Sequence, residues 1–318
     1  MKERILVMGA SGMVGGELVP ALRKKYGAEN IIASDIREES EVFKGTGPFH
    51  TLDALDVAGT KTLVEKEEVS TIYMLAGLIS AGGEKNPKLC WDLNMGSLRQ
   101  VLDLAVEKKL KVFWPSSIAA FGPTTPRKGT PQKTVIEPTT IYGITKYAGE
   151  LLCQYYNRRW GVDVRSLRYP GLISWKSEPG PGTTEYAVEI FYGALKEKKY
   201  TSPLSADTYL PMMYMDDAMA GTLQLMEAPG EKIKNRMSYN FSAISFSPVE
   251  IAAEIKKHIP DFKIDYASDH RQAIADSWPE SIDDLEARRD WGWKHEYDLP
   301  KMTEMMLKNL REKLKISI

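Results

Sequence analysis

A tyrosine and a lysine at helical spacing are the residues of this chain best suited to acid–base chemistry. Tyr142 and Lys146 are four positions apart, which places a phenol and an amine on one face of a helix. A nearby ammonium favours the phenolate, so we expect Lys146 to lower the pKa of Tyr142 and make it a general base near neutral pH. Such a pair is common on solvated helices. Ser116 and Ser117 strengthen the case, because they end an apolar segment at the expected ligand-binding edge of a parallel sheet.

A glycine-rich run near the start of the chain has the pattern of a phosphate-binding loop. It lies between an apolar segment and a helical pattern, where glycines permit a tight turn and let the backbone approach a pyrophosphate. The helix that follows offers free N–H groups and the positive end of its dipole. A plain strand-to-helix turn would need only one glycine. We therefore predict that the cofactor-binding residues include Gly9, Ser11, Gly12, Met13, Val14 and Gly15.

Asp35 ends the next apolar segment and indicates which dinucleotide is bound. A carboxylate at this place accepts hydrogen bonds from both ribose hydroxyls and repels a 2′-phosphate, which favours NAD over NADP. Arg37 argues against this preference, because it could bind the 2′-phosphate of NADP. Asp35, Ile36 and Arg37 are all predicted to contact the cofactor. The alternative for Asp35 is an ordinary solvated loop acid.

The elements that must position these residues alternate between strands and helices. The strands are continuous apolar runs, as expected of strands buried on both faces, and the helices between them imply βαβ units. The sequence therefore predicts an α/β fold with a Rossmann-type doubly wound parallel sheet. The expected strands are 5–10, 31–36, 71–76, 112–116 and 164–169, and the expected helices are 15–26, 60–67, 93–108 and 144–160.

The pattern changes after Pro170 and predicts a second, smaller domain. We expect an NAD-binding Rossmann domain over 1–173, with a return segment at about 213–234. Segments 174–212 and 235–318 would form a smaller C-terminal α/β substrate-binding cap. Its expected elements are a loop at 174–184 and helices at 185–198, 248–258 and 283–291.

Composition excludes several classes of protein. The 318 residues carry 42 Lys and Arg against 43 Asp and Glu, so a basic field for nucleic acid or anionic lipid is not expected. The 2 cysteines and 4 scattered histidines show no metal-binding spacing, although a single disulfide is possible. No run of about 18 apolar residues and no signal-peptide pattern occurs. We expect a soluble, cytoplasmic protein without a metal or a membrane span.

Together, the glycine loop, Asp35, the serine pair and Tyr142-x-x-x-Lys146 resemble the extended short-chain dehydrogenase/reductase superfamily. The resemblance adds further expected cofactor contacts from the adenine to the nicotinamide. These are Leu55 and Asp56 at the adenine, Leu75, Ala76 and Gly77 beside the ribose, Asn94 on the fourth helix, and Tyr169, Pro170 and Leu172 along the nicotinamide. Pro170-Gly171 stands where sugar epimerases often have Phe-Asn.

Within that superfamily the chain resembles, over essentially its whole length, the NAD-dependent L-threonine 3-dehydrogenases of the epimerase-like type. The strings that carry this resemblance are Trp114-Pro115-Ser116-Ser117-Ile118, Asp163 to Gly171, Gly182-Thr183-Thr184-Glu185-Tyr186-Ala187, Pro211-Met212-Met213-Tyr214-Met215 and Asp276-Ser277-Trp278-Pro279. The resemblance implies oxidation of L-threonine at its 3-hydroxyl to 2-amino-3-oxobutanoate, with hydride passing to NAD. Tyr142 would be the base, Lys146 would assist it and hold the nicotinamide ribose, and Ser117 would bind the hydroxyl.

The same resemblance implies where the rest of the substrate binds. The resemblance assigns substrate contact to the loop that precedes a helix, first to Thr184 and then to Thr183. Free N–H groups at the start of that helix suit the substrate carboxylate. Ser80 and Ser116 are further expected substrate contacts. Trp278 is either a lid over the substrate or a core residue. By analogy, a homodimer would form through the helices at 93–108 and 144–160.

Two other functions remain open at this stage. The nearer one is another extended reductase, such as a nucleotide-sugar epimerase or dehydratase, which would need a deep pocket for a nucleotide. The remoter one is a non-catalytic, nucleotide-sensing regulator. Loss of Tyr142 or Lys146 would mark such a regulator, and both residues are present.

Overall fold

A seven-stranded sheet in the order β10-β6-β5-β4-β1-β2-β3 organises the first part of the chain. The structure is a computed structural model that describes residues 3–180 and 182–316. The strands are β1 (Ile5–Met8), β2 (Ile31–Asp35), β3 (Phe49–Thr51), β4 (Thr71–Met74), β5 (Lys111–Ser117), β6 (Val164–Tyr169) and β10 (Tyr239–Asn240). β1 pairs in parallel with β2 and β4, and the pairs β2–β3 and β4–β5 are parallel too. The predicted Rossmann-type α/β fold is confirmed.

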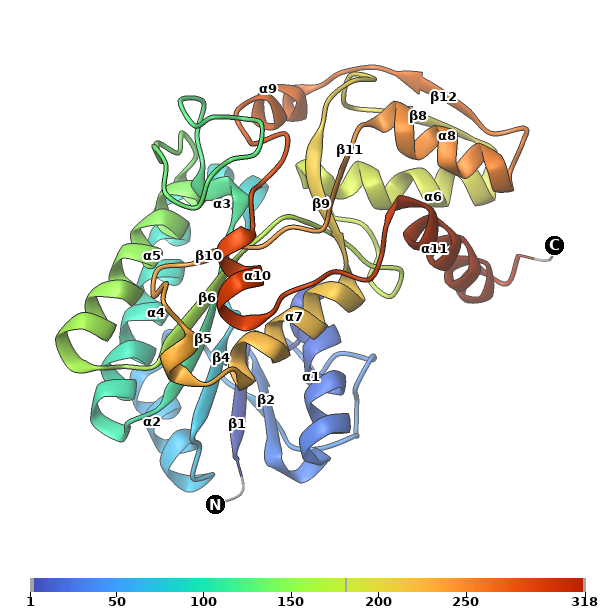
Figure 1. The fold of residues 1–318 in the computed structure, drawn as a ribbon. Helices are drawn as coiled ribbons and strands as arrows, with labels where there is room; N and C mark the ends of the chain where they lie inside the picture. The colour runs from blue at the N-terminus through green and yellow to red at the C-terminus, as the bar shows by residue number, and fades with distance from the viewer. Residues whose placement is uncertain (1–2, 181, 317–318) are drawn as a thin grey trace. The chain divides into compact units, whose positions relative to one another are not determined.

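Helices cover this sheet because its strands are apolar on both faces. α1 (Met13–Tyr26) covers one face, and α2 (Val57–Lys66), α4 (Pro87–Lys108) and α5 (Ile141–Trp160) cover the other (Figure 1). Leu102 of α4 and Cys153 of α5 join Trp114 of β5 in one buried cluster. The sheet therefore gives α5, which carries Tyr142 and Lys146, a rigid support.

The two long helices begin earlier than the apolar pattern predicted. α4 starts at Pro87, where the Asn86 side chain accepts a hydrogen bond from the N–H of Leu89 at 3.2 Å. α5 starts at Ile141, and the Thr140 hydroxyl accepts from the N–H of Gly143 at 3.1 Å. These polar caps extend each helix beyond its apolar stripe. As a result, Tyr142 lies in the first turn of α5.

The later part of the chain forms two small sheets and a group of helices. β7 (Gly171–Ile173), β9 (Leu210–Tyr214) and β11 (Ile244–Phe246) make a mixed three-stranded sheet, and β8 (Lys199–Ser202) pairs in parallel with β12 (Lys263–Tyr266). α6 (Tyr186–Lys196), α8 (Pro248–His258) and α11 (Leu299–Leu314) pack on one another. The remaining helices are α3 (Ser80–Lys85), α7 (Met215–Glu227), α9 (His270–Asp276) and α10 (Leu285–Trp291).

Residue contacts divide the chain into two units. The first comprises Met1–Ala120, Pro138–Arg168 and Thr222–Tyr239, and the second comprises Phe121–Glu137, Tyr169–Gly221 and Asn240–Ile318. Segment Phe121–Glu137 groups with the second unit through backbone contacts such as Glu280 N–H to the carbonyl of Arg127 at 2.7 Å. The division into cofactor and cap domains given above stays a prediction. Among the described residues, no helix is both long and apolar enough to cross a membrane.

Candidate active site

The glycine loop of the first unit is fixed by very close backbone packing. Gly9 has a φ of 84°, and a Cβ there would lie 2.5 Å from the backbone N of Ala76. A Cβ on Gly15 would lie 2.4 Å from the carbonyl O of Ala10. The N–H groups of Gly9 and Ala10 both donate to the carbonyl of Ser34, at 2.9 and 3.0 Å. Only glycine fits at these two positions, so the loop is held between β2 and the turn after β4.

The N-terminus of α1 at the end of this loop is open to an anion. Its N-cap is Gly12, no side chain caps it, and its first turn contains no acidic residue. The N–H groups and positive dipole end of such a helix suit a pyrophosphate. Met13 in that turn has an exposed side chain.

Asp35 lies at the end of β2, beside the glycine loop. Its carboxylate accepts from the N–H of Ser11 at 3.0 Å and from Arg37, through the backbone N–H at 3.0 Å and Nε at 3.1 Å. Burial acts to raise the pKa of Asp35, but the hydrogen bonds from Arg37 and Ser11 outweigh it and hold this pKa below its ordinary value. The carboxylate is therefore charged, and Arg37 is its ion-pair partner.

Two apolar side chains near Asp35 are unusually exposed. Ile36 follows β2 and is 65% exposed, and Leu55 follows β3 and is 38% exposed. Since β1, β2 and β3 are parallel, these residues share an edge of the sheet with the glycine loop. Asp56, by contrast, caps α2 by accepting from the N–H of Gly59 at 2.9 Å.

Asn94 joins the turn after β4 to α5. Its Oδ1 accepts from the N–H of Leu78 at 2.8 Å, while its Nδ2 donates to the carbonyl of Leu78 at 3.0 Å and to the Thr145 hydroxyl at 3.1 Å. A Cβ on Gly77 would lie 2.8 Å from Asn94 Oδ1. Leu75 is tied to β1 by its N–H, which donates to the carbonyl of Met8 at 2.8 Å. Asn94 therefore holds the predicted ribose turn against the helix that carries the Tyr/Lys pair.

Tyr142, Lys146 and Ser117 come together at the start of α5 and the end of β5. The Ser117 side chain is the polar neighbour that acts on the Tyr142 phenol and favours its charged form. Lys146 Nζ donates to the carbonyl of Pro115 at 2.6 Å and lies 5.4 Å from the centre of the Tyr142 ring. It also lies 4.6 Å from the centre of a Trp114 ring. A phenol, a hydroxyl and an amine therefore share one small region.

The pKa values of this pair differ from the sequence prediction. Burial raises the pKa of Tyr142 to about 12, and the nearby Ser117 hydroxyl opposes that shift. Burial lowers the pKa of Lys146 to about 8, and the negative charge of Glu150 opposes that shift. The prediction that Lys146 would bring the Tyr142 pKa below its ordinary value is wrong for this structure, because desolvation of the phenol dominates. Lys146 keeps its charge below about pH 8.

Ser116 has a different environment from its neighbour Ser117. It is buried, and its hydroxyl donates to Oε1 of Glu150 at 2.6 Å. Glu150 was not among the residues predicted from the sequence. Its spacing of four residues from Lys146, on the helix face of Tyr142, was the available signal.

The remaining predicted substrate and nicotinamide residues, except Ser80, belong to the second unit. A Cβ on Gly171 would lie 2.8 Å from Thr184 Cγ2, so Thr184 packs against the strand that follows Pro170 and contains Leu172. Thr183 is buried next to it. Other predicted residues lie elsewhere: Tyr169 has its ring 5.8 Å from that of Phe241, Trp278 is 6% exposed and its carbonyl accepts from Arg127 Nε at 3.2 Å, and Ser80 begins α3 in the first unit.

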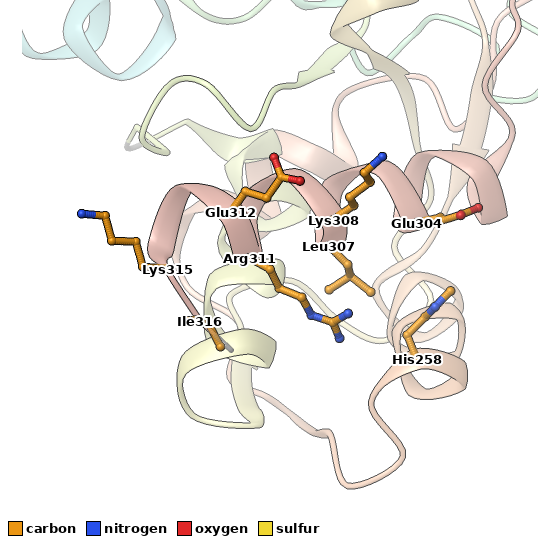
Figure 2. A pocket seen from close by; sticks show the side chains of 8 residues that line it. All are labelled: His258, Glu304, Leu307, Lys308, Arg311, Glu312, Lys315 and Ile316. Carbon is orange, nitrogen blue, oxygen red and sulfur yellow. The ribbon is translucent and has the colours of Figure 1, made fainter. Parts of the chain in front are cut away.

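A separate open hollow of about 670 Å³ lies along α8 and α11 (Figure 2). Figure 2 shows the Arg311 side chain directed toward His258. The lining mixes cations, carboxylates and apolar side chains, and it includes none of the predicted site residues. It consists of His258, Glu304, Leu307, Lys308, Arg311, Glu312, Lys315 and Ile316. Such a mixed set of charges selects no particular ligand charge.

The cysteines and histidines supply no further centre within the described residues. Cys90 and Cys153 are free and buried. No group of three or more His, Cys, Asp or Glu side chains in residues 3–180 and 182–316 could hold a metal ion.

The sheet order, the glycine loop and the Tyr142/Lys146 pair define an extended short-chain dehydrogenase/reductase. The model of the NAD dependent epimerase/dehydratase family matches residues 5–242, and the chain belongs to that family. Its cofactor is therefore NAD, as predicted. The glycine loop, the uncapped α1 N-terminus and the charged Asp35 fit a dinucleotide.

Relatives and solved structures agree over nearly the full length. An uncharacterized epimerase/dehydratase of Staphylococcus haemolyticus is 52% identical over 98% of both chains. The GalE-like L-threonine dehydrogenase from Cupriavidus necator, in its holo form, is 52% identical with a TM-score of 0.94 over 96% of this chain and 99% of that one. The L-threonine dehydrogenase from Clostridium difficile is 48% identical with a TM-score of 0.97 over 99% of both. The resemblance to this group is confirmed.

Proposed function

We propose that this protein is an NAD-dependent dehydrogenase that oxidises L-threonine at its 3-hydroxyl to 2-amino-3-oxobutanoate. One observation carries the proposal. The phenol of Tyr142 has Ser117 and Lys146 as its polar neighbours, in a chain about half identical over nearly its whole length to proteins named L-threonine dehydrogenases. The family alone would leave the substrate open.

The first unit supplies most of the residues that would hold NAD, and Tyr169, Pro170 and Leu172 of the second unit would line the nicotinamide. The loop from Gly9 to Gly15 and the N-terminus of α1 would bind the pyrophosphate, and Asp35 would accept from the adenosine ribose hydroxyls. Ile36 and Leu55 offer apolar surface for the adenine. Lys146 would donate to the nicotinamide ribose. Bound NAD accepts a hydride, and the protein residues supply the proton transfer.

Tyr142 would act as the general base of this oxidation. Ser117 would hydrogen-bond the substrate 3-hydroxyl, and the Tyr142 phenolate would take its proton. The C3–H bond then breaks with its electron pair leaving as hydride, and the C3–O bond becomes a carbonyl. Since burial raises the pKa of Tyr142 to about 12, the phenolate needs the adjacent ammonium of Lys146.

The amino-acid end of the substrate would be bound by the polar groups of the predicted substrate loop. Thr184, and then Thr183, would bind the carboxylate at the start of α6, with Ser80 as a further donor. Trp278 would contribute apolar surface that excludes water. Ser116 contributes indirectly, because its hydroxyl is bound to Glu150.

A second candidate function is epimerisation or dehydration of a nucleotide sugar. It is favoured by the names of the curated relatives, which are uncharacterized epimerase/dehydratases. The same tyrosine could serve as base for a sugar hydroxyl. The two functions differ in substrate, so they separate in one assay.

The deciding experiment measures NADH absorbance with L-threonine and, in parallel, product formation from nucleotide sugars. We expect turnover only with L-threonine. Tyr142→Phe should lower kcat by roughly 10²–10⁴-fold, the usual contribution of one general base, and leave NAD binding intact. Tyr266→Phe on β12 is the matched control, because that ring is exposed. Turnover of a nucleotide sugar but not L-threonine would reject the proposal in favour of the alternative.

A further inference from the structure

A buried acid lies on the same face of α5 as the Tyr/Lys pair, one helical turn beyond Lys146. Glu150 has none of its surface exposed. Its Oε1 accepts from the Ser116 hydroxyl at 2.6 Å and from Arg168 Nε at 2.9 Å, and its Oε2 accepts from Arg168 Nη2 at 2.7 Å. Arg168 itself is 1% exposed. A buried charge persists only when it is paired and hydrogen-bonded, as this carboxylate is.

The Glu150 network is the third of three contacts that hold α5 against β5 and the turn that follows β5. In the first turn, Gly143 packs so closely that a Cβ would lie 2.1 Å from the carbonyl O of Ala119. One turn later, Lys146 Nζ donates to the carbonyl of Pro115 at 2.6 Å. At the next turn, Glu150 binds Ser116. Each of these contacts involves a different neighbour of Ser117 along the chain. Together they therefore fix the position of Ser117 relative to Tyr142.

We propose that Glu150 and Arg168 are positioning residues for the Tyr142/Lys146/Ser117 group. The Glu150 carboxylate holds the Ser116 hydroxyl and with it the strand end that presents Ser117 and the Pro115 carbonyl. The Arg168 guanidinium, from β6, balances the charge that this contact requires. The inference rests on the proposed function, because it assigns a role relative to the proposed base.

The charge of Glu150 also acts on Lys146. The groups that face Lys146 are Tyr142, Glu150 and Cys153 on α5, Cys90 on α4, and the Trp114 ring with the Pro115 carbonyl on β5. Of these, Glu150 is the carboxylate, and its negative charge favours the ammonium. Glu150→Gln keeps the size and one acceptor but removes that charge and leaves the Arg168 cation without it.

The test compares Glu150→Gln, the double variant Glu150→Gln/Arg168→Gln, and Glu254→Gln. Glu254 is the matched control: a buried carboxylate on α8, in the second unit, that accepts from Lys257 at 2.6 Å. We expect Glu150→Gln to lower kcat by roughly 10–100-fold, the range seen when partners that orient a metal ligand are removed, with a smaller change in KM. Glu254→Gln should keep the wild-type kcat.

A second readout follows Lys146 itself and needs no turnover. In protein labelled with ε-¹³C lysine, the resonance of Lys146 is assigned by its loss in Lys146→Met and followed against pH. Its titration should move to lower pH in Glu150→Gln and return part of the way in the double variant, which also removes the positive charge of Arg168. A residue that only stabilised the fold would not produce this order.

Each result decides the inference. Wild-type kcat and an unmoved Lys146 titration in Glu150→Gln would overturn it, and so would a shift to higher pH. If Glu150→Gln does not fold, the charge-neutral double variant is compared with wild type, where a lower kcat at an unchanged fold supports the inference and an unchanged kcat overturns it. If the wild-type protein does not oxidise L-threonine, the proposed function is wrong. The Lys146 titration then still tests whether Glu150 acts on Lys146.

Discussion

At Asp35, one carboxylate meets both the glycine loop and an arginine. Arg37 is engaged with Asp35, and its guanidinium lies near Gly12, since a Cβ there would be 3.7 Å from Arg37 Nη2. Arg37, which could bind a 2′-phosphate, is therefore ion-paired with Asp35, which would repel one. This pairing explains how both residue types can stand at the same site of an NAD-dependent protein.

Replacing Asp35 should change the choice of cofactor. In Asp35→Ser, the ribose loses its charged acceptor and Arg37 loses its partner. A hydrogen bond to a charged group contributes about 1.5–3 kcal/mol, so kcat/KM for NAD should fall roughly 10–100-fold while that for NADP rises. Initial rates with both cofactors measure this. An unchanged preference for NAD would show that Asp35 is an ordinary loop acid.

Lys146 should lower stability in return for its function. Its ordinary pKa of 10.5 falls to about 8 on folding, which corresponds to a penalty on the order of 3 kcal/mol when the amine is charged. We expect Lys146→Met to raise the free energy of unfolding at pH 7 by about 1–2 kcal/mol, since loss of the Pro115 hydrogen bond and the Trp114 contact offsets part of the gain.

The pH dependence gives this prediction its sign. Below pH 8 the amine is charged in both folded and unfolded protein, so the full penalty is present. Between about pH 8 and 10.5 the unfolded state binds more protons, and wild-type stability gains on that of the variant. Urea unfolding at pH 7 and pH 10 measures the difference. A variant less stable than wild type at pH 7 would contradict the prediction.

At the scale of elements, α5 depends on two glycines that let it approach β5 and the turn that follows β5. A Cβ on Gly143 would lie 2.1 Å from the carbonyl O of Ala119, and one on Gly149 would lie 2.3 Å from the Trp114 ring. The first obstacle is backbone and cannot move aside. The distance from α5 to the sheet, and so the place of Tyr142, follows from these missing side chains.

Gly143→Ala should therefore destabilise the protein and reduce activity together. We expect a loss of about 1–3 kcal/mol, the usual cost of overpacking, because α5 must shift away from Ala119. Gly16→Ala in α1 is the control, since the nearest atom to its Cβ would be Ser40 Oγ at 3.9 Å, and a helix interior gains about 0.5–1 kcal/mol from alanine. Equal melting temperatures for the two variants would contradict the close-packing argument.

The strands and the cofactor loop could be predicted because their signals are local. Buried parallel strands such as Ile5–Met8 are continuous apolar runs, and the glycine loop lies directly between one strand and one helix. β3 (Phe49–Thr51) was not predicted, because three residues are too few to show a strand's alternating pattern. α11 was not predicted either, although Asp298 caps it and Pro300 lies in its first turn. There, helical spacing of methionines was an available signal.

Long-range pairing could not be predicted from the sequence. Glu150 finds Arg168 and Ser116 only because α5 crosses the sheet beside β5 and β6, so its partner depends on packing. The pKa of Tyr142 likewise depends on packing and could not be predicted from the sequence. The spacing of Tyr142 and Lys146 gave the right neighbours, but the burial that raises this pKa to about 12 depends on the whole surrounding core.

At the scale of the whole molecule, α4 and α5 leave apolar side chains exposed on the first unit. On α5 these are Ile144, Leu151 and Tyr155, at spacings of seven and four that share one helix face. On α4 they include Trp91 and Val106. Exposed apolar side chains gathered on two adjacent helices are typical of an interface. We propose that a second copy of the chain covers them, as a homodimer through these helices.

Charges placed on this face should separate the copies. The variant Leu151→Asp/Tyr155→Asp puts two carboxylates where the proposed interface is apolar, and each buried unpaired charge is strongly unfavourable. We expect wild type to run as a dimer by light scattering at micromolar concentration, and the variant as a folded monomer whose dimer is at least about tenfold weaker. Leu285→Asp on α10 is the control, because Leu285 is the most exposed of the large apolar residues described, at 67%. A wild-type monomer, or a variant that stays dimeric, would place the subunit contact elsewhere or remove it.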